Sequence, residues 1–207
     1  MTDTIALRRA ERADIPQLAR MFADSFADDP FVSWIVRDDA RRRASFEHLF
    51  VVTLEALSSK LRETYTDEAL SGCIVWRTSA ECKLPLWREL ALVPAFCKIS
   101  GVARIPQLFA AFAQLDALHE HHAPEPHQYL HVLGVAPERQ RRGIGHALLQ
   151  PALDRFDAAM QPAYLETFKA SNLPFYERHG FRCVGRVESA PLPPGWLMRR
   201  EPKQHHE

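Results

Sequence analysis

The sequence predicts an α/β fold in which a mixed central sheet is covered by helices on both faces. Two observations lead to this prediction. β-type runs and helical apolar patterns alternate along the chain, and an apolar helical region separates the third predicted strand from the fourth. Because 207 residues with 46% hydrophobic content can bury one sizeable core, we expect residues 1–207 to form a single domain.

The first part of the chain predicts one strand, two helices and then two strands. Ile5–Arg9 alternates apolar and polar residues like a strand, and Asp14–Pro16 begins a helix with proline in its first turn. This helix should end near Asp28–Pro30, because the residue before a proline resists the helical conformation. PFVSWIV follows as a short apolar segment, and Asp38–Ser59 reads as a long helix. LRETYTD and GCIVWRT then predict two strands joined by a turn over residues 68–72.

A helical insertion, at about residues 84–123, is predicted between the third and fourth strands. Its helical periodicity should break at Pro94, Gly101 and Pro106, which gives two or three helices. The histidine-rich stretch HEHHAPEPH at its end reads as a solvated linker, and it offers no carboxylate or cysteine at the spacing of metal ligands. We therefore assign no metal site.

The last part of the chain alternates strands and helices. Tyr129–Val135 is a strongly β-prone run, and the helix after it should reach about Ala159, with a kink at Pro151. Ala163–Phe168 predicts the next strand, LPFYERHG a short helix that ends at Gly180, and FRCVGRVES and WLMRR the final strands.

Charge and composition limit the class of partner and the compartment. The 26 basic and 26 acidic residues cancel, so no global charge favours nucleic acid or an anionic membrane. The apolar runs are too short to span a bilayer, and the charged amino terminus lacks the pattern of a secretory signal. Four cysteines without a CxxC pair fit reduced thiols. We expect a cytoplasmic protein, and a homodimer stays open as its assembly.

The segment APERQRRGIGHALL, residues 136–149, predicts a local anion site. It places three arginines and two glycines between a strand and the start of a helix. The first N–H groups of a helix lack intrahelical partners and lie at the positive end of its dipole. The glycines Gly143 and Gly145 allow a phosphate to approach the backbone closely. Such a turn suits a pyrophosphate.

This segment has three alternative interpretations. A solvated turn at the start of a surface helix is the simplest of them. A dinucleotide-binding turn would need GxGxxG, whereas His146, Ala147 and Leu148 follow the second glycine here. A Walker loop would need Gly-Lys-Ser or Gly-Lys-Thr, and neither occurs. Both nucleotide-binding interpretations are weakened.

LGVAPERQRRGIGHALL resembles the acyl-CoA-binding segment of the GNAT superfamily of N-acyltransferases. Its pattern is Gln or Arg, two residues, Gly, one residue, then Gly or Ala, which Gln140, Gly143 and Gly145 satisfy. ETFKASNLPFYERHGF is similar to the second signature of this superfamily, in which an Asn precedes a short Tyr-bearing helix ending in Gly-Phe. The resemblance is detailed over residues 129–199. It implies a mostly antiparallel sheet whose strands splay apart at the cofactor site.

The resemblance also implies acetyl-CoA as co-substrate, bound by the segment at about residues 129–182. The backbone of the strand would pair with the pantetheine arm and the acetyl carbonyl, the glycine turn would wrap the pyrophosphate, and Asn172 would bond to the arm. Tyr176 would approach the sulfur. The implied cofactor-binding residues are Leu133, Gly134, Val135, Gln140, Arg141, Arg142, Gly143, Ile144, Gly145, His146, Asn172 and Tyr176.

The transfer reaction itself requires a base, an oxyanion donor and an acid. An amine with a pKa near 10.4 is mostly protonated at neutral pH, so a base must remove a proton before attack. The N–H of Leu133 is a candidate donor to the oxyanion. Tyr176 is the candidate acid for the CoA thiolate, with packing of its ring on the sheet as the structural alternative.

The base has two candidates, His131 and Glu166. His131 lies two residues before Leu133, so the period of a strand predicts that both side chains point to one face. Glu166 lies on the next strand, where the resemblance implies that the strands splay. A buried hydrogen-bonded histidine and a glutamate paired with an arginine are the structural alternatives. We favour Glu166 slightly.

The leading hypothesis for function is an acetyl-CoA-dependent N-acetyltransferase that acts on a primary amine, either a small molecule or an exposed amino group. The alternative is a non-catalytic CoA-binding regulatory domain of the same fold, and a nucleotide-binding protein is disfavoured. Residues 27–34 and the insertion should shape the acceptor pocket. The aromatic residues Trp34, Phe96, Phe109 and Phe112 hint at a partly hydrophobic acceptor.

Overall fold

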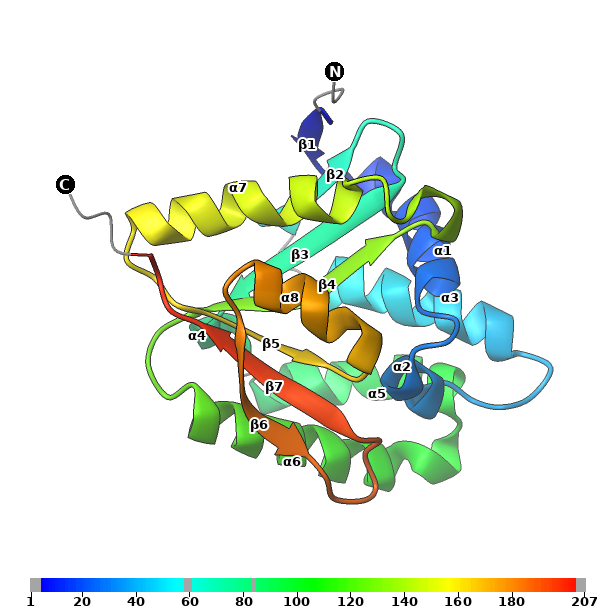
Figure 1. Cartoon of the computed structure of the whole chain (residues 1–207). Coiled ribbons are helices and arrows are strands. Elements are labelled where there is room, and N and C mark those ends of the chain that lie inside the picture. The colour runs from blue at the N-terminus through cyan, green and yellow to red at the C-terminus, as the bar shows by residue number, and fades with distance from the viewer. Residues whose placement is uncertain (1–4, 58–60, 83–84, 204–207) are drawn as a thin grey trace.

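A single mixed sheet organises the chain. The computed structural model describes residues 5–57, 61–82 and 85–203, and its strands follow the order β1-β2-β3-β4-β5-β7-β6 (Figure 1). Neighbouring strands are antiparallel except β4 and β5, which are parallel. This confirms the predicted mixed, mostly antiparallel sheet. The strands are β1 (Leu7–Arg9), β2 (Thr64–Asp67), β3 (Gly72–Thr78), β4 (Gln128–Val135), β5 (Ala163–Thr167), β6 (Arg182–Val187) and β7 (Gly195–Arg200).

One face of the sheet packs against the amino-terminal helices and the insertion. Phe22, Phe50 and Val75 belong to one apolar cluster on this face, and Ala111 of the insertion packs with Tyr164 in a second. The helices of this face are α1 (Ile15–Ser25), α2 (Pro30–Ile35), α3 (Arg42–Val52), α5 (Leu86–Ser100) and α6 (Ile105–His122), and we call it the insertion face.

The opposite face packs against α7 (Ile144–Ala158) and α8 (Leu173–Arg178), and we call it the α7 face. Leu149 and Phe156 of α7 pack with Trp76 of β3, and Tyr176 of α8 packs with Leu165 of β5. Figure 1 shows α7 running across the upper part of the sheet and α8 in front of β4 and β5. Both faces are covered, as predicted.

Short elements connect these layers. They include a four-residue helix, α4 (Ser79–Cys82), and a π-helical turn at Thr53–Leu57. The 3₁₀ turns are Arg12–Asp14, Val102–Arg104, Pro137–Arg139 and Ala170–Asn172. Within the described parts of the chain, no helix is both long and apolar enough to cross a membrane.

Three sequence predictions about helices are corrected by the structure. PFVSWI is helical, because Asp29 caps α2 by accepting hydrogen bonds from the backbone of Phe31 and Val32 at 2.9 and 3.0 Å. The long helix begins at Arg42 rather than Asp38 and passes into the π-helical turn after Val52. Its predicted end at Ser59 lies outside the described residues.

The predicted break at Pro94 does not occur, whereas the predicted extent of the helix that contains Pro151 is confirmed. Helix α5 continues through Pro94 to Ser100, and α7 continues through Pro151 to Ala158. Tertiary packing compensates for the backbone donor that each proline lacks. Gly101 does end α5, with a φ of 89°, and Pro106 lies in the first turn of α6, where a missing N–H costs nothing.

A buried ion pair joins α7 to the last strand. The guanidinium of Arg200 donates to both oxygens of Asp157 at 2.7 and 2.6 Å, and the two side chains are only 1% and 6% exposed. Arg200 Nε also donates to the carbonyl of His179 at 2.9 Å. Because all of these groups are desolvated, removal of one partner leaves the other as an uncompensated buried charge.

We predict that Arg200→Met lowers the free energy of unfolding by about 3–5 kcal/mol, as measured by urea denaturation. The matched control is Arg199→Met. Arg199 pairs with Glu125 and Glu201, which are 60% and 67% exposed, so this variant should lose less than about 1 kcal/mol. Adding Asp157→Leu to Arg200→Met should recover much of the loss, because no buried charge then remains. Equal losses for the two arginine variants would contradict the prediction.

Candidate active site

The two parallel strands at the centre of the sheet separate soon after they begin. Strand β4 pairs with β5 only at Gln128–Ala163 and Tyr129–Tyr164, although β4 continues to Val135 and β5 to Thr167. Figure 1 shows the two strands opening into a V. Beyond Tyr129, the edge of β4 that faces β5 therefore has no strand partner among the described residues. This is the splay that the resemblance implied.

A bulge in β4 determines where its side chains point. Val75 of β3 is opposite Val132 and Trp76 is opposite Leu130, so His131 is an extra residue without a partner in β3. Val132 belongs to the cluster on the insertion face and Leu133 to the cluster on the α7 face. The His131 ring lies 5.6 Å from the ring of Tyr129, which packs on the insertion face.

The prediction that His131 and Leu133 share a face is therefore wrong. The period of two that it assumed holds only for a regular strand, and the bulge shifts the alternation by one residue. His131 faces the insertion, whereas the side chain of Leu133 faces α7.

A cavity of about 410 Å³ passes through the opening between β4 and β5. Its walls include Leu133, Leu165 and Tyr176, which belong to the cluster of the α7 face. They also include Tyr129 and Val132 from the insertion face. A ligand in this cavity can thus contact groups on both sides of the sheet. Of the predicted site residues, the cavity brings together His131, Leu133, Glu166, Asn172 and Tyr176.

Glu166 is a buried carboxyl on β5 that faces the insertion. Its Oε2 accepts a hydrogen bond from the Tyr129 hydroxyl at 2.7 Å, and the side chain is 9% exposed. Burial raises the pKa of Glu166 to about 7, against the opposing effect of the Tyr129 hydrogen bond. The carboxyl can therefore exchange a proton near neutral pH, as a general base requires. Among the described residues, no arginine forms an ion pair with Glu166, which was the predicted alternative.

The histidine-rich stretch contributes two buried side chains, which corrects its prediction as solvated linker. His119 and His127 are 9% and 5% exposed, and their Nε2 atoms lie 2.6 Å apart. His127 Nδ1 lies 2.7 Å from the Glu125 carbonyl, an acceptor only, so Nδ1 of His127 carries a proton. With both rings neutral, His119 Nε2 donates its proton to the unprotonated His127 Nε2. The unprotonated Nδ1 of His119 then faces Glu166 Oε1 at 3.8 Å. Burial lowers the pKa of His119 to about 4, in keeping with a neutral ring.

The sequence did not indicate which polar side chains lie beside Glu166. Tyr129 and His119 are 37 and 47 positions away from Glu166 along the chain, and the topology alone makes them neighbours. No local sequence signal could have found them, because the parallel pairing of Tyr129 with Tyr164, which places residue 166 near the start of β4, exists only in the folded sheet. Within the described residues, no group of three His, Cys, Asp or Glu side chains could hold a metal ion.

His131 differs sharply from Glu166 as a candidate base. Burial lowers the pKa of His131 to about 3, with a further lowering by the nearby guanidinium of Arg77. Its Nδ1 is buried without a hydrogen-bond partner among the described residues. The ring is neutral at physiological pH but only weakly basic.

Tyr176 and Asn172 reach the cavity from the segment that contains α8. Pro174 lies in the first turn of this helix, and Gly180 closes it with a φ of 88°. Burial raises the pKa of Tyr176 well above its usual range, and the charge of Asp29 contributes. Its hydroxyl therefore carries a proton throughout the physiological range. Asn172 Nδ2 donates to Thr167 Oγ1 at 3.2 Å, which ties the start of α8 to the end of β5.

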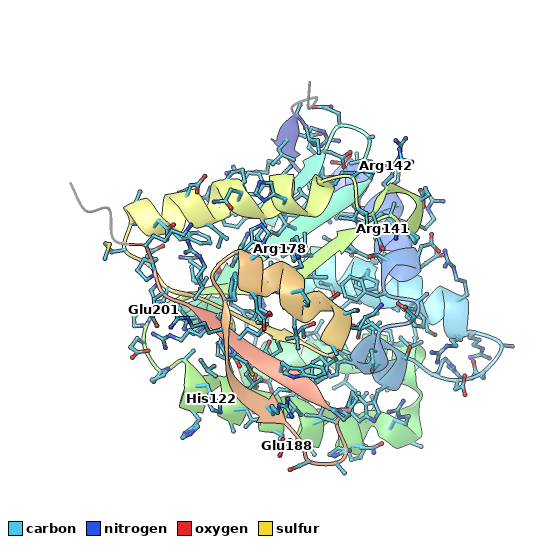
Figure 2. All side chains as sticks on the ribbon, in the orientation of Figure 1. His122, Arg141, Arg142, Arg178, Glu188 and Glu201 are labelled. Carbon is cyan, nitrogen blue, oxygen red and sulfur yellow. The ribbon has the colours of Figure 1, made fainter. Side chains whose placement is uncertain are left out.

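The basic glycine turn lies at the amino end of α7. Gly143 caps the helix in the left-handed region at φ 83°, and a Cβ there would meet no atom within 4 Å. Arg139, Arg141 and Arg142 are exposed, and none forms a salt bridge to a described residue. Figure 2 shows Arg141 and Arg142 on this turn at the surface. Such a turn offers free N–H groups and positive charge to an anion.

The other residues of this segment fix the turn rather than line the cavity. Gln140 Nε2 donates to the Val135 carbonyl at 3.1 Å, and Ile144 is buried beneath the helix. Gly145 lies against the ring of Phe175, and Gly134 leaves room for Phe22, which a Cβ would approach to 2.6 Å. His146 Nδ1 lies 2.9 Å from His179 Nε2. The predicted residues that do not line the cavity are Gly134, Val135, Gln140, Arg141, Arg142, Gly143, Ile144, Gly145 and His146.

Three of the four aromatic residues expected near the acceptor line the cavity, and one does not. Phe96, Phe109 and Phe112 line the cavity from α5 and α6. Trp34 does not, because its ring packs on Phe31 with Arg104 over it at 5.0 Å.

A protein-family model agrees with the fold and with the position of the site. The model of the GNAT acetyltransferase domain matches residues 101–183, which include β4, the glycine turn, β5 and α8.

Solved structures share the fold over nearly the whole chain. The crystal structure of histone acetyltransferase HPA2 and related acetyltransferase from Corynebacterium glutamicum has 21% identity and a TM-score of 0.68, with 97% of this chain and 98% of that chain covered. A Drosophila melanogaster polyamine N-acetyltransferase that forms N-acetylagmatine has 12% identity and a TM-score of 0.63, with 95% and 99% covered. A chain of the NatC complex bound to Gag peptide and CoA has 15% identity and a TM-score of 0.53, with 95% and 98% covered.

We predict that Tyr129→Phe raises the pKa of Glu166 above about 7. The phenol stabilises the carboxylate, and loss of a hydrogen bond to a charged group costs about 1.5–3 kcal/mol. An infrared titration of the protonated carboxyl band would measure the change, with Glu166→Gln identifying the band by its absence. Tyr65→Phe is the matched control, since the Tyr65 hydroxyl contacts Arg9 and Arg155 instead. A midpoint that is unchanged or lower in Tyr129→Phe would refute the prediction.

Proposed function

We propose that this protein, a member of the GNAT superfamily of acetyltransferases, is an acetyl-CoA-dependent N-acetyltransferase that acts on a primary amine by direct attack. In this proposal, residues 1–207 act as one N-acetyltransferase domain. We further propose that it acts in the cytoplasm, in keeping with four free cysteines.

The observation that carries this proposal is the cavity through the opening between β4 and β5. It has a buried carboxyl with a pKa of about 7 on the insertion face and a protonated tyrosine, Tyr176, on the α7 face. Acyl transfer to an amine needs a base for the nucleophile and an acid for the leaving group. Here the two groups lie on opposite sides of the sheet, so an amine and a thioester can enter from different directions.

The residues present fit acetyl-CoA. The glycine turn offers exposed arginines and an open approach at Gly143 to a pyrophosphate, and the free edge of β4 offers backbone groups to an amide-bearing arm. In the proposal, residues 140–146 hold the pyrophosphate, and Leu133, Gly134 and Val135 hold the arm. Asn172 assists them. Acetyl-CoA supplies the activated acetyl group.

The proposed chemistry moves protons at named atoms. The Glu166 carboxylate takes a proton from the ammonium of the acceptor, and the freed amine attacks the acetyl carbonyl. The N–H of Leu133 donates to the oxygen that becomes negative. The C–S bond then breaks, and Tyr176 Oη protonates the departing sulfur. The second proton of the nitrogen restores the Tyr176 hydroxyl, and Glu166 passes the first proton to the solvent, so one proton is released in each turnover.

Burial explains why Glu166 rather than His131 is assigned as the base. A carboxyl with a pKa of about 7 accepts a proton from an ammonium more readily than an imidazole with a pKa of about 3. In this assignment, His131 stays a neutral wall of the site.

We predict that acetyl-CoA raises the melting temperature of the protein and that Gly143→Asp abolishes this effect. Ligand at 100 times its Kd stabilises a folded protein by about 2.7 kcal/mol, and the new carboxylate would repel the pyrophosphate. Gly101→Asp is a matched control, because Gly101 also has a positive φ and open space around its Cβ position. NAD should have no effect on any variant. Retained stabilisation of Gly143→Asp by acetyl-CoA would exclude the turn as the pyrophosphate site.

We predict that Glu166→Gln and Tyr176→Phe each lower kcat by about 10²- to 10⁴-fold while the Kd of acetyl-CoA stays nearly unchanged. Turnover would be followed by thiol release with an amine found in a substrate panel. In the unaltered protein, kcat/KM should fall as the pH drops below about 7, because protonation of Glu166 removes the base. Unchanged turnover in either variant, with chemistry rate-limiting, would exclude the role assigned to that residue. A protein that binds acetyl-CoA but acetylates no amine would favour the non-catalytic alternative.

A further inference from the structure

The insertion builds the half of the cavity that lies away from the cofactor residues. In the proposed function, Leu133, Asn172 and Tyr176 belong to the half that receives the acetyl group. The other half is enclosed by α2, α3, α5 and α6 on the insertion face. An acceptor must therefore occupy the space between these helices, with its amino group directed toward Glu166.

The walls of this acceptor half are apolar and partly aromatic. Except for Glu89, Asp116 and His119, every described residue that α5 and α6 contribute to the lining is apolar. Phe96 and Phe112 pack edge to face at 5.6 Å, and Phe109 is still 36% exposed although it lines the cavity. Helices α2 and α3 add only apolar side chains, Phe31, Val32, Ile35, Leu49 and Phe50. The walls can pack against an apolar body but offer it few polar contacts.

Side-chain amides and free hydroxyl groups are scarce among the described residues of this half. Helices α2, α3, α5 and α6 contribute no Asn, Gln or Ser to the lining among the described residues. The hydroxyl of Thr53, which also lines the cavity, donates to the Leu49 carbonyl at 3.0 Å. A sugar or an extended peptide here would bury polar groups without partners, at a cost of about 1–3 kcal/mol for each.

The charges on the lining select for a cation. Four carboxyl groups line the cavity, on Asp29, Glu89, Asp116 and Glu166, whereas Arg77 is the one basic residue among the described lining residues apart from neutral histidines. The Arg77 guanidinium donates to the backbone carbonyl of Glu81. An ammonium is attracted to such a lining, and an acceptor that carries its own carboxylate is repelled.

We infer that the acceptor is an amine with an apolar, aromatic-sized body and no carboxylate, held between α2, α3 and the insertion helices. This inference rests on the proposed N-acetyltransferase activity and adds the class of amine. The body packs against the Phe96, Phe109 and Phe112 side of the cavity, and the ammonium is directed toward Glu166. Amino sugars are excluded as preferred acceptors by the apolar walls, and free amino acids by the carboxyl groups of the lining.

The test compares kcat/KM for amines that each differ from the expected acceptor in one chemical feature. 2-Phenylethylamine and phenylalanine methyl ester have an apolar body and no carboxylate. Phenylalanine adds the carboxylate, and glucosamine replaces the apolar body with a sugar. Agmatine and spermidine add further positive charge. We expect the first two to exceed all others by on the order of 100-fold, because unpaired buried polar groups discriminate strongly. Acetyl-CoA binding is measured in parallel by thermal unfolding.

A pair of α6 variants tests where the body lies. Phe112→Ala should raise the KM for 2-phenylethylamine by on the order of 10- to 100-fold with little change in the KM for acetyl-CoA. Leu118→Ala is the matched control, because Leu118 lies on the same helix and packs on another cluster without lining the cavity. It should leave both constants within about twofold.

The outcomes separate the inference from the function on which it rests. Preference for agmatine, spermidine, glucosamine or phenylalanine would overturn the acceptor class and leave the N-acetyltransferase activity standing. Equal effects of Phe112→Ala and Leu118→Ala on the KM for 2-phenylethylamine would overturn the placement of the body. Absence of acetylation for every amine, in a protein that binds acetyl-CoA, would overturn the proposed function itself and the acceptor class with it.

Discussion

The early separation of β4 from β5 is the constraint on which the rest of the site depends. Two strands that paired along their whole length would close the sheet, and no passage would join its two faces. Because pairing stops after Tyr129, backbone groups of β4 stay available and a cavity crosses the sheet. The separated strands need support from both sides. Helix α8 gives it on one face and the insertion on the other.

Burial at this opening shifts the pKa values of a carboxyl and an imidazole far from their ordinary values. The same desolvation raises the pKa of Glu166 to about 7 and lowers that of His131 to about 3, because it disfavours the charged form of each group. The pKa of a carboxyl and the pKa of an imidazole thus shift in opposite directions in the same environment. Tyr129 holds the carboxylate in place, and the His119–His127 pair behind it presents a defined tautomer.

The insertion has two functions in this arrangement. Through Ala111, Leu115 and Leu118 it covers the strands at the β6 side of the sheet, and through Phe96, Phe109 and Phe112 it encloses the acceptor half of the cavity. The polar end of α6 adds His119 to the buried network around Glu166. One segment therefore contributes to stability, to the shape of the acceptor space and to the surroundings of the proposed base. Under the proposed function, the sequence of this segment should therefore influence which amine is accepted.

Local sequence determined the elements and the glycine turn of this protein. The order of strands, the start of α1 at Asp14–Pro16, the end of α8 at Gly180 and the cap at Gly143 depend on periodicity, proline and positive φ, which act over a few residues. Tyr176 and Glu166 could be named because a family pattern and a strand placed them. Tertiary structure alone decided the direction of His131, since the bulge depends on pairing with β3. It also decided the burial of His119 and His127 and the continuity of α5 through Pro94, because neighbours far away in the chain supply the desolvation and the packing on which these features depend.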